Sequence, residues 1–287
     1  MPYGVSFFEE ITQNTCYTYR KKRVPYEELT LADDFMFCKV MQNEELCKEL
    51  LQRILCIPIE KIVYTDSQKV LDDTVDGKSV RLDVYVKDEK HTVYDIEMQT
   101  SNTKELPKRS RYYHACIDKS QLSKGKTYNY LTDTYVIFIC TFDLFRKGLA
   151  KYSFDSLCRE DPSIELQDGR HTIFVNTNGK SDVPKLQEVL HYLNTGDFSD
   201  DSEFLSELDL EVQSASKNAQ WKEEYDMLIA REQVLREEGR EEGRQEGRNE
   251  ERIALVKIAL TEETPETVSK MLHIPLDEVL KIKFEEI

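Results

Sequence analysis

The chain has 287 residues, of which 39% are hydrophobic and 33% are charged, and it carries a net charge of −16 at pH 7. Its longest apolar stretches, such as Tyr135 to Cys140, are far shorter than the roughly 20 residues of a membrane helix, so we expect a cytoplasmic protein without membrane contact. The seven cysteines form no Cys-x-x-Cys pair, which argues against a zinc knuckle and a disulfide framework.

Residues 1–29 show weak periodicity, and we expect an N-terminal arm there. The basic run Arg20 to Arg23 within it is too short to identify a ligand. From Ala32 the apolar residues follow helical spacing, with a break expected at Asn43 and a second helical stretch up to Leu55. These helices would begin a domain of residues 30–196.

Three β-rich segments follow, at Lys61 to Asp66, Ser79 to Val86 and Thr92 to Gln99. A short polar stretch near Lys90 joins the last two segments and suits a hairpin connection. The three segments therefore predict an antiparallel meander.

Pro107 stands where the first turn of a helix tolerates proline, and Arg109 to Tyr130 is expected to be a long amphipathic helix with a break near Gly125. Tyr135 to Thr141 predicts a buried strand, and Thr172 to Asn176 a further strand. Strand, helix and strand in this order favour a right-handed crossover and a mixed sheet. The sequence therefore predicts an α/β fold, with a mixed sheet flanked by helices and an α-helical C-terminal extension.

The negative charge is unevenly distributed. From Asp197 to the end there are 25 acidic and 12 basic residues, whereas the preceding part has 30 acidic and 27 basic residues. Lys104 to Lys126 contains seven basic residues and two acidic ones, which makes a local basic patch. Because such a patch is typical of phosphate binding, the acidity of the whole chain does not exclude DNA as a partner.

Residues 197–252 are expected to form a charged helical linker. Its imperfect Glu-Gly-Arg-x repeat places three glycines at i, i+4 spacing: Gly239, Gly243 and Gly247. Each glycine costs a helix about 1 kcal/mol relative to alanine. Two interpretations stay open: the glycines let two helices approach closely, or they belong to a solvated connector.

Residues 253–287 predict a small helical domain of three short helices, at Ile253 to Leu260, Pro265 to Leu272 and Leu276 to Ile282. The last two resemble a helix-turn-helix in outline, but their acidic flanks favour contacts with protein over reading of a DNA groove. Together with the stripe formed by Gly239, Gly243 and Gly247, this region predicts a homo-oligomer formed through the C-terminal helices.

The predicted hairpin has one apolar face and one polar face, because side chains alternate along a strand. The polar face collects Arg81, Asp83, Tyr85, Asp95, Glu97 and Gln99. The hairpin places Asp83 opposite Glu97, where facing residues have Cβ atoms about 4.5–5.5 Å apart. Two carboxylates are therefore expected to converge.

Such carboxylates oppose each other's ionisation unless a cation lies between them or the site is open to water. Mg²⁺ prefers oxygen ligands and binds one or two carboxylates, waters and substrate phosphate, which fits Asp83 and Glu97; Mn²⁺ is an alternative. The ion would activate a water and stabilise charge on a phosphate. The other interpretation is an ordinary solvated face of a hairpin.

Five segments also carry a resemblance to a known family: Asp34-Phe35-Met36-Phe37, Leu82-Asp83-Val84, Ile96-Glu97-Met98-Gln99, Lys108-Arg109-Ser110-Arg111-Tyr112-Tyr113 and Lys124-Gly125. They resemble the Rpn family of recombination-promoting nucleases and transposase-like proteins, within the PD-(D/E)XK nuclease superfamily. The resemblance extends from about Leu31 to the C-terminus.

This resemblance implies a restriction-endonuclease-like core in which Asp83 and Glu97 ligate the metal and Asp34 is a helix carboxylate facing the site. It places Gln99 at the position of the superfamily's lysine. A lysine acts there through its charge and a glutamine only through hydrogen bonds, although glutamine is the usual form in the Rpn family. The implied function is that of a Mg²⁺-dependent endonuclease that cuts DNA and promotes recombination.

The resemblance also gives the basic helix a role in binding DNA. Arg109 and Lys108 are expected to bind phosphates, with Lys124 beside them. Tyr112 or Tyr113 is expected to stack on bases, although Tyr113 could instead belong to the core. No residue pattern supports the joining of strands. The alternative function is a catalytically inactive nuclease-fold protein that acts as a DNA-binding or protein-assembly module.

Overall fold

The computed structural model describes residues 24–71, 80–199 and 201–284. The basic run Arg20 to Arg23, predicted within the N-terminal arm, lies outside these residues. The chain divides into two compact units, of which the first ends at Lys222 and the second begins at Glu223. The domain boundaries predicted after residues 29, 196 and 252 stay predictions.

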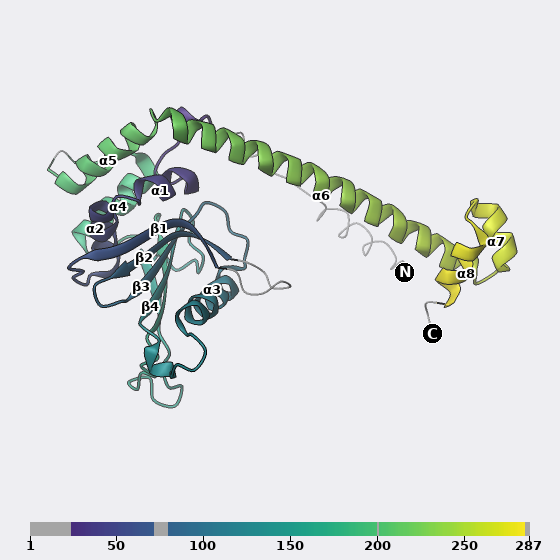
Figure 1. Ribbon diagram of the computed structural model, residues 1–287, viewed down its shortest axis with the longest axis horizontal. Coiled ribbons are helices and arrows are strands. Elements are labelled where there is room, and N and C mark those ends of the chain that lie inside the picture. Colours follow the sequence, from purple (N-terminus) through teal and green to yellow (C-terminus); the bar gives the residue numbers. More distant parts are fainter. Residues whose placement is uncertain (1–23, 72–79, 200, 285–287) are drawn as a thin grey trace, which may run out of the picture. The chain divides into compact units, whose positions relative to one another are not determined.

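The first unit is built on a mixed sheet, which in the described residues has six strands in the order β1-β2-β3-β4-β6-β5 (Figure 1). The strands are β1 (Ile62–Leu71), β2 (Val80–Asp88), β3 (Val93–Gln99), β4 (Thr134–Cys140), β5 (Lys151–Phe154) and β6 (Arg170–Asn176). The strands β1, β2 and β3 are antiparallel neighbours, β3, β4 and β6 are parallel, and β5 is antiparallel to β6. The predicted α/β fold with a mixed sheet is confirmed, as is the predicted meander.

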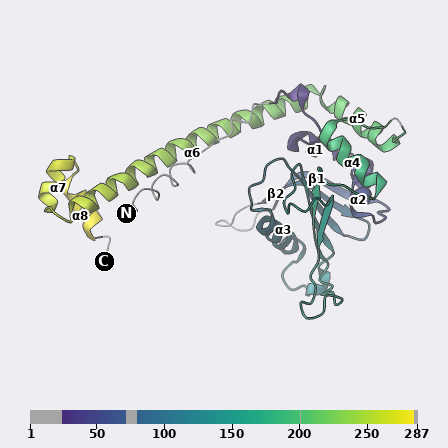
Figure 2. The same cartoon turned by 180° about the vertical axis from the view of Figure 1, so that it is seen from behind.

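Helices cover both faces of the sheet (Figures 1 and 2). On one face lies α3 (Leu106–Gln121), whose Tyr113 ring packs 6.1 Å from the ring of Phe138 on β4. On the other face, α1 (Asp34–Val40) contacts β1, β2 and β3, and α2 (Glu44–Leu55) contacts β1. The central strands are therefore buried on both sides, which leaves little water around any polar side chain that they carry.

Asn43 separates α1 from α2, as the sequence predicts. Its side chain accepts hydrogen bonds from the backbone N–H groups of Glu45 at 3.2 Å and Leu46 at 3.3 Å, so it caps the N-terminus of α2. Pro107 lies in the first turn of α3, also as predicted.

The break predicted near Gly125 is confirmed, but the helix predicted at Arg109 to Tyr130 ends earlier and does not resume as an α-helix. The helix α3 ends at Gln121, and Gly125 then turns the chain in the left-handed conformation, with a φ of +88°. Residues Tyr128–Tyr130 form a separate 3₁₀ turn, η2.

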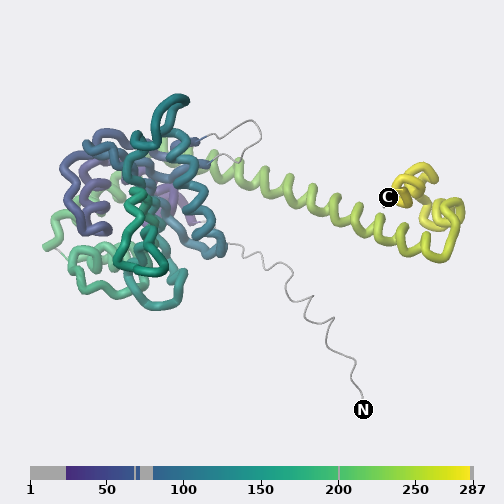
Figure 3. The backbone as a smooth tube through the Cα atoms, turned by 90° about the horizontal axis from the view of Figure 1, so that it is seen from below, coloured from purple at the N-terminus to yellow at the C-terminus, as the bar shows by residue number. Residues whose placement is uncertain are grey.

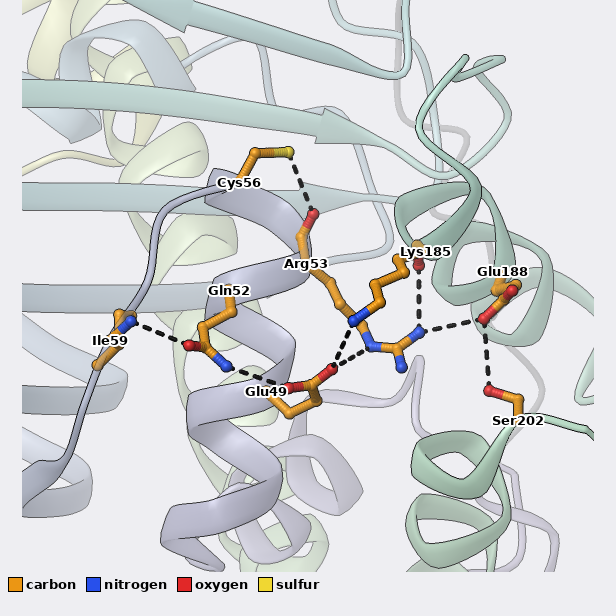
Figure 4. Close-up of polar contacts among 8 residues, drawn as sticks. All are labelled: Glu49, Gln52, Arg53, Cys56, Ile59, Lys185, Glu188 and Ser202. Carbon is orange, nitrogen blue, oxygen red and sulfur yellow. Dashed lines mark hydrogen bonds and ion pairs between the residues drawn. The ribbon is translucent and has the colours of Figure 1, made fainter.

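Arg53 of α2 contacts two other helices of the first unit, and Figure 4 shows its polar contacts with Glu49 and Glu188. It donates to the Glu49 carboxylate on its own helix at 2.9 Å and to Glu188 of α4 (Pro184–Thr195) at 3.1 Å. Its guanidinium also lies 4.4 Å from the ring centroid of Phe204 in α5 (Glu203–Ala215). The α5 helix is therefore packed against other helices of the first unit, although it lies within the segment predicted from the sequence to be a linker.

The helix α6 (Ala219–Ala259) is continuous through the Glu-Gly-Arg repeat (Figure 3). The prediction of a separate helix at Ile253 to Leu260 is wrong, because these residues are the last turns of α6 and the residue that follows. A Cβ atom added at Gly239, Gly243 or Gly247 would meet no atom within 4 Å. On the helix, glutamates flank one side of this glycine stripe and arginines flank the other: Glu238, Glu242 and Glu246 against Arg240, Arg244 and Arg248.

The second unit has a small core of its own. The predicted helix Pro265–Leu272 is confirmed as α7, and the last helix is α8 (Leu276–Phe284). They pack with the end of α6 around the buried side chains of Val256, Val268 and Val279. Within the residues that the structure describes, no helix has both the length and the apolar character needed to cross a membrane.

Candidate active site

Asp83 and Glu97 lie together where the backbone pairing of β2 and β3 ends. Val84 and Ile96 are the last paired residues on this side of the hairpin. Next to them, the backbone N–H of Asp83 donates to Glu97 Oε1 at 3.0 Å, and the backbone N–H of Met98 donates to Asp83 Oδ2 at 3.3 Å. Beyond the last backbone pair, the two strands are therefore joined by side-chain carboxylates, and each carboxylate accepts a hydrogen bond from a backbone N–H of the opposite strand.

The polar face of this hairpin is buried, because α3 covers it. Glu97 is 1% exposed, Asp95 0% and Tyr85 2%, so the interpretation of a solvated hairpin face is wrong. Burial and, after it, the neighbouring charge of Asp83 raise the pKa of Glu97 to about 8. Burial and, after it, the charge of Asp34 likewise raise the pKa of Asp83 to about 6.

Arg109 projects from α3 towards these carboxylates. Its Nη2 donates to Glu97 Oε2 at 2.5 Å, and its Nη1 donates to Gln99 Oε1 at 3.1 Å. The guanidinium carbon lies 5.1 Å from the ring centroid of Tyr113 and 5.4 Å from that of Phe138. The arginine is therefore part of the carboxylate cluster, a contact that the sequence does not predict because a loop and the first turn of a helix separate it from β3.

Asp34 and Cys38 reach the same region from α1. Asp34 is exposed at the start of the helix, and its carboxylate accepts a hydrogen bond from the backbone N–H of Phe35 at 2.8 Å. The Sγ of Cys38 donates to the backbone oxygen of Asp83 at 3.4 Å, and burial raises the pKa of this thiol so that it stays neutral. The helix carboxylate thus influences Asp83 through its charge.

Asp95 is a member of this cluster that sequence analysis left without a role. Both of its carboxylate oxygens are buried and have no hydrogen-bond partner, and burial followed by the charge of Glu97 raises its pKa well above the usual range. The signal available in the sequence is its place two residues before Glu97, which puts both side chains on one face of β3. The sequence alone does not show that a helix covers this face.

Comparison with known families identifies the chain. The model of the family described as "PD-(D/E)XK nuclease family transposase" matches residues 32–254. The protein belongs to this family. No curated protein and no solved structure gives a match. The resemblance to PD-(D/E)XK nucleases seen in the sequence is confirmed, together with the restriction-endonuclease-like fold class.

The carboxylates of this PD-(D/E)XK family member fit a divalent cation. Asp83, Asp95 and Glu97 are buried or half-buried, with Arg109 near all three and Arg81 near Asp83, so added positive charge would offset their remaining repulsion. No group of three or more His, Cys, Asp or Glu side chains in the described part of the chain could hold a metal ion. Asp83 and Glu97 could provide two ligands for such an ion, with water or phosphate oxygens as the others, as is common for Mg²⁺.

The residues expected to bind DNA are spread along α3 of this family member. Arg109 is turned towards Glu97, and Lys108 is exposed beside it. Tyr112 is half-buried and packs against the core beneath the helix. The helix α3 continues for about 18 Å beyond Arg109, at 1.5 Å per residue. Lys124 is exposed in the turn that follows the end of this helix. The structure therefore brings together Asp83, Glu97, Gln99 and Arg109, and leaves Lys124 at the far end of the helix.

Proposed function

We propose that the protein is a Mg²⁺-dependent endodeoxyribonuclease that hydrolyses phosphodiester bonds in DNA. The observation that carries the proposal is the convergence of Asp83 and Glu97 in a buried place, with each carboxylate fixed by a backbone donor. Membership of a nuclease family supports the reaction class. Mn²⁺ has the same preference for oxygen ligands and would replace Mg²⁺ in the reaction.

Asp83 and Glu97 would hold the ion, which when bound activates a water and stabilises negative charge on the phosphate. Gln99 would orient the attacking water by a hydrogen bond, and Asp34 would assist from the start of α1. The oxygen of water forms a new bond to phosphorus, and the bond from phosphorus to one bridging oxygen breaks. The protons of water end on the departing oxygen and in solvent, which leaves one hydroxyl end and one phosphate end.

The basic side chains of α3 would hold the DNA beside this site. Lys108 is exposed one residue before Arg109, and phosphate contacts position a nucleic acid without reading its sequence. Tyr112 and Lys124 would extend the contact along the helix. We propose that these residues contribute to DNA affinity and that the carboxylates carry out the cleavage.

Nicking of supercoiled plasmid tests the function. Purified protein is expected to nick the plasmid with Mg²⁺ and not with EDTA, and the Asp83→Ala, Glu97→Ala double variant is expected to lose nicking. A matched control is the Asp182→Ala, Glu165→Ala variant, since both carboxylates are exposed and outside the site. Nicking by the site variant at the wild-type rate would contradict the assignment of these residues.

The second candidate function is a binding or assembly module on an inactive nuclease fold. The observation that favours it is Gln99, which provides no charge at the position of the superfamily's lysine. This alternative predicts DNA binding without turnover. Folded, metal-loaded wild-type protein that binds plasmid and leaves it uncut would support it against the endonuclease.

We also propose that the protein forms homo-oligomers through its C-terminal helical region. The support is the glycine stripe of α6, whose exposed backbone would let a second helix approach closely. The charged sides of the stripe are suited to pairing across such a contact.

A further inference from the structure

Arg109 engages one end of the Gln99 side chain through a hydrogen bond. A guanidinium group only donates hydrogen bonds, whereas an amide side chain has an acceptor oxygen and a donor nitrogen. Because Nη1 of Arg109 donates to Gln99 Oε1 at 3.1 Å, the oxygen is engaged by the arginine. The amide nitrogen of Gln99 therefore faces away from Arg109, and the side chain presents a donor.

Arg109 is itself held in place by several groups. Nη2 donates to Glu97 Oε2 at 2.5 Å, and the guanidinium lies against the rings of Tyr113 and Phe138. Its side chain is only 29% exposed. A charge fixed in this way is oriented before substrate binds and needs no reorganisation during the reaction.

We propose that Arg109 is a positioning residue that acts through Gln99, and that the two together replace the lysine of the superfamily. Arg109 supplies the positive charge, and Gln99 supplies the donor that faces the reacting phosphate or water. This inference rests on the proposed endonuclease function. It differs from the phosphate-binding role expected for Arg109, because the arginine acts on a protein side chain.

The physical basis is polarisation of one hydrogen bond by another. A bond from a charged donor withdraws electron density from the amide oxygen, which makes the N–H groups of the same amide stronger donors. A polarised amide stabilises negative charge on a phosphate better than an isolated glutamine does, and removal of one such donor typically costs about 10²–10³ in rate. The pair thus accounts for catalysis by a site with glutamine in the lysine position.

The test is a double-mutant cycle on the full-length protein, measured as the plasmid nicking rate at saturating DNA and Mg²⁺. Gln99→Leu and Arg109→Met should each lower the rate by at least about 100-fold. The double variant should lose no more than either single variant, because residues that act as a unit are not additive. Gln99→Lys in the Arg109→Met background should recover at least about tenfold over Arg109→Met alone, since it returns both charge and donor.

Binding of Mn²⁺, measured by calorimetry, provides a readout apart from cleavage. Gln99→Leu should bind Mn²⁺ within about twofold of the wild type, because both carboxylates and Arg109 remain. Arg159→Met is the matched control, since it removes an exposed arginine outside the site and should leave the nicking rate unchanged. If Arg109→Met does not fold, Gln99→Leu and its Mn²⁺ affinity still decide the role of the amide.

Three results would overturn the inference. Wild-type nicking by Gln99→Leu would show that the amide has no role, while the endonuclease function would stand. Losses that multiply in the double variant would show that the two residues act separately. A wild-type protein that does not nick would overturn the proposed function and this inference with it.

Discussion

Three acidic side chains of the site, Asp83, Asp95 and Glu97, are buried or half-buried, and this burial affects their protonation. Asp95 and Glu97 are almost fully buried, and one arginine, Arg109, faces them. Desolvation disfavours the ionised form of each carboxyl group, and the charge of each neighbour disfavours it further. The folded protein without metal therefore holds protons at this site that the unfolded chain would release at neutral pH.

Stability in EDTA is therefore expected to fall as the pH rises. The folded-state pKa values of Asp83 and Glu97, about 6 and about 8, exceed their ordinary values of 3.8 and 4.5. The native state binds more protons in this window, so the free energy of unfolding decreases between about pH 4 and about pH 8. Thermal unfolding should show the decrease in EDTA, and Mg²⁺ should restore stability more at pH 8 than at pH 6.

The Asp83→Asn, Glu97→Gln variant is the control for this prediction, because it removes both titrations with little change in shape. It also separates the pair from His114, whose pKa burial lowers to about 4 and whose contribution has the opposite sign. Identical pH profiles for the wild type and the variant in EDTA would contradict the prediction.

The sequence is sufficient to bring Asp83 and Glu97 together, because period-two alternation and a short connection determine the register of a hairpin. It does not show that their face is buried, because the pattern of the two strands carries no information about where the later helix α3 packs. The contact between Arg109 and Glu97 depends on how α3 docks on the sheet. Asp95 shows the same limit of the sequence. Strand alternation places it on the polar face, but alternation is the same whether that face is buried or exposed to water.

Among the elements, α6 differs most from the expectation. It is continuous through three glycines that lower helix stability, and a Cβ atom added at any of them would meet nothing within 4 Å. Most helices and strands of the first unit could be predicted, because apolar periodicity marks the long strands and α2. The strand β5 was missed because four residues, of which only Tyr152 is buried, are too few for a period to be visible.

Replacement of Gly239, Gly243 and Gly247 by alanine should separate the two interpretations of this stripe. Each alanine favours the helix by about 1 kcal/mol, so the helical signal in circular dichroism should persist to higher temperature. If the stripe is a contact between copies, the added methyl groups hold the backbones apart, and we expect association to weaken in light scattering. Gln245→Ala, on the far side of the helix, should leave association unchanged. An unchanged mass in the glycine variant would favour the solvated connector.

At the scale of the whole molecule, the first unit needs α5 for its stability. The side chains of Phe204, Leu205 and Leu208 are buried there, and complete exposure of such a residue costs about 1.5–3 kcal/mol. The hydroxyl of Tyr26 also donates to the backbone oxygen of Ala215 at 2.6 Å, which ties the beginning of the described chain to this helix.

A chain that ends at Lys222 is therefore expected to remain folded and monomeric in light scattering, whereas the full-length chain should form dimers or larger assemblies. A chain that ends at Asn194 lacks α5 and should be less stable and prone to aggregation. Equal, monomeric masses for the full-length chain and the chain ending at Lys222 would refute self-association through the C-terminal helices.

The unlike charges on the two sides of the glycine stripe also have a consequence for symmetry. A twofold axis parallel to α6 would place the glutamate side of one copy against the arginine side of the other, whereas a perpendicular twofold axis would bring like charges together. The charges therefore favour parallel pairing, in which both nuclease units join their helices at the same end.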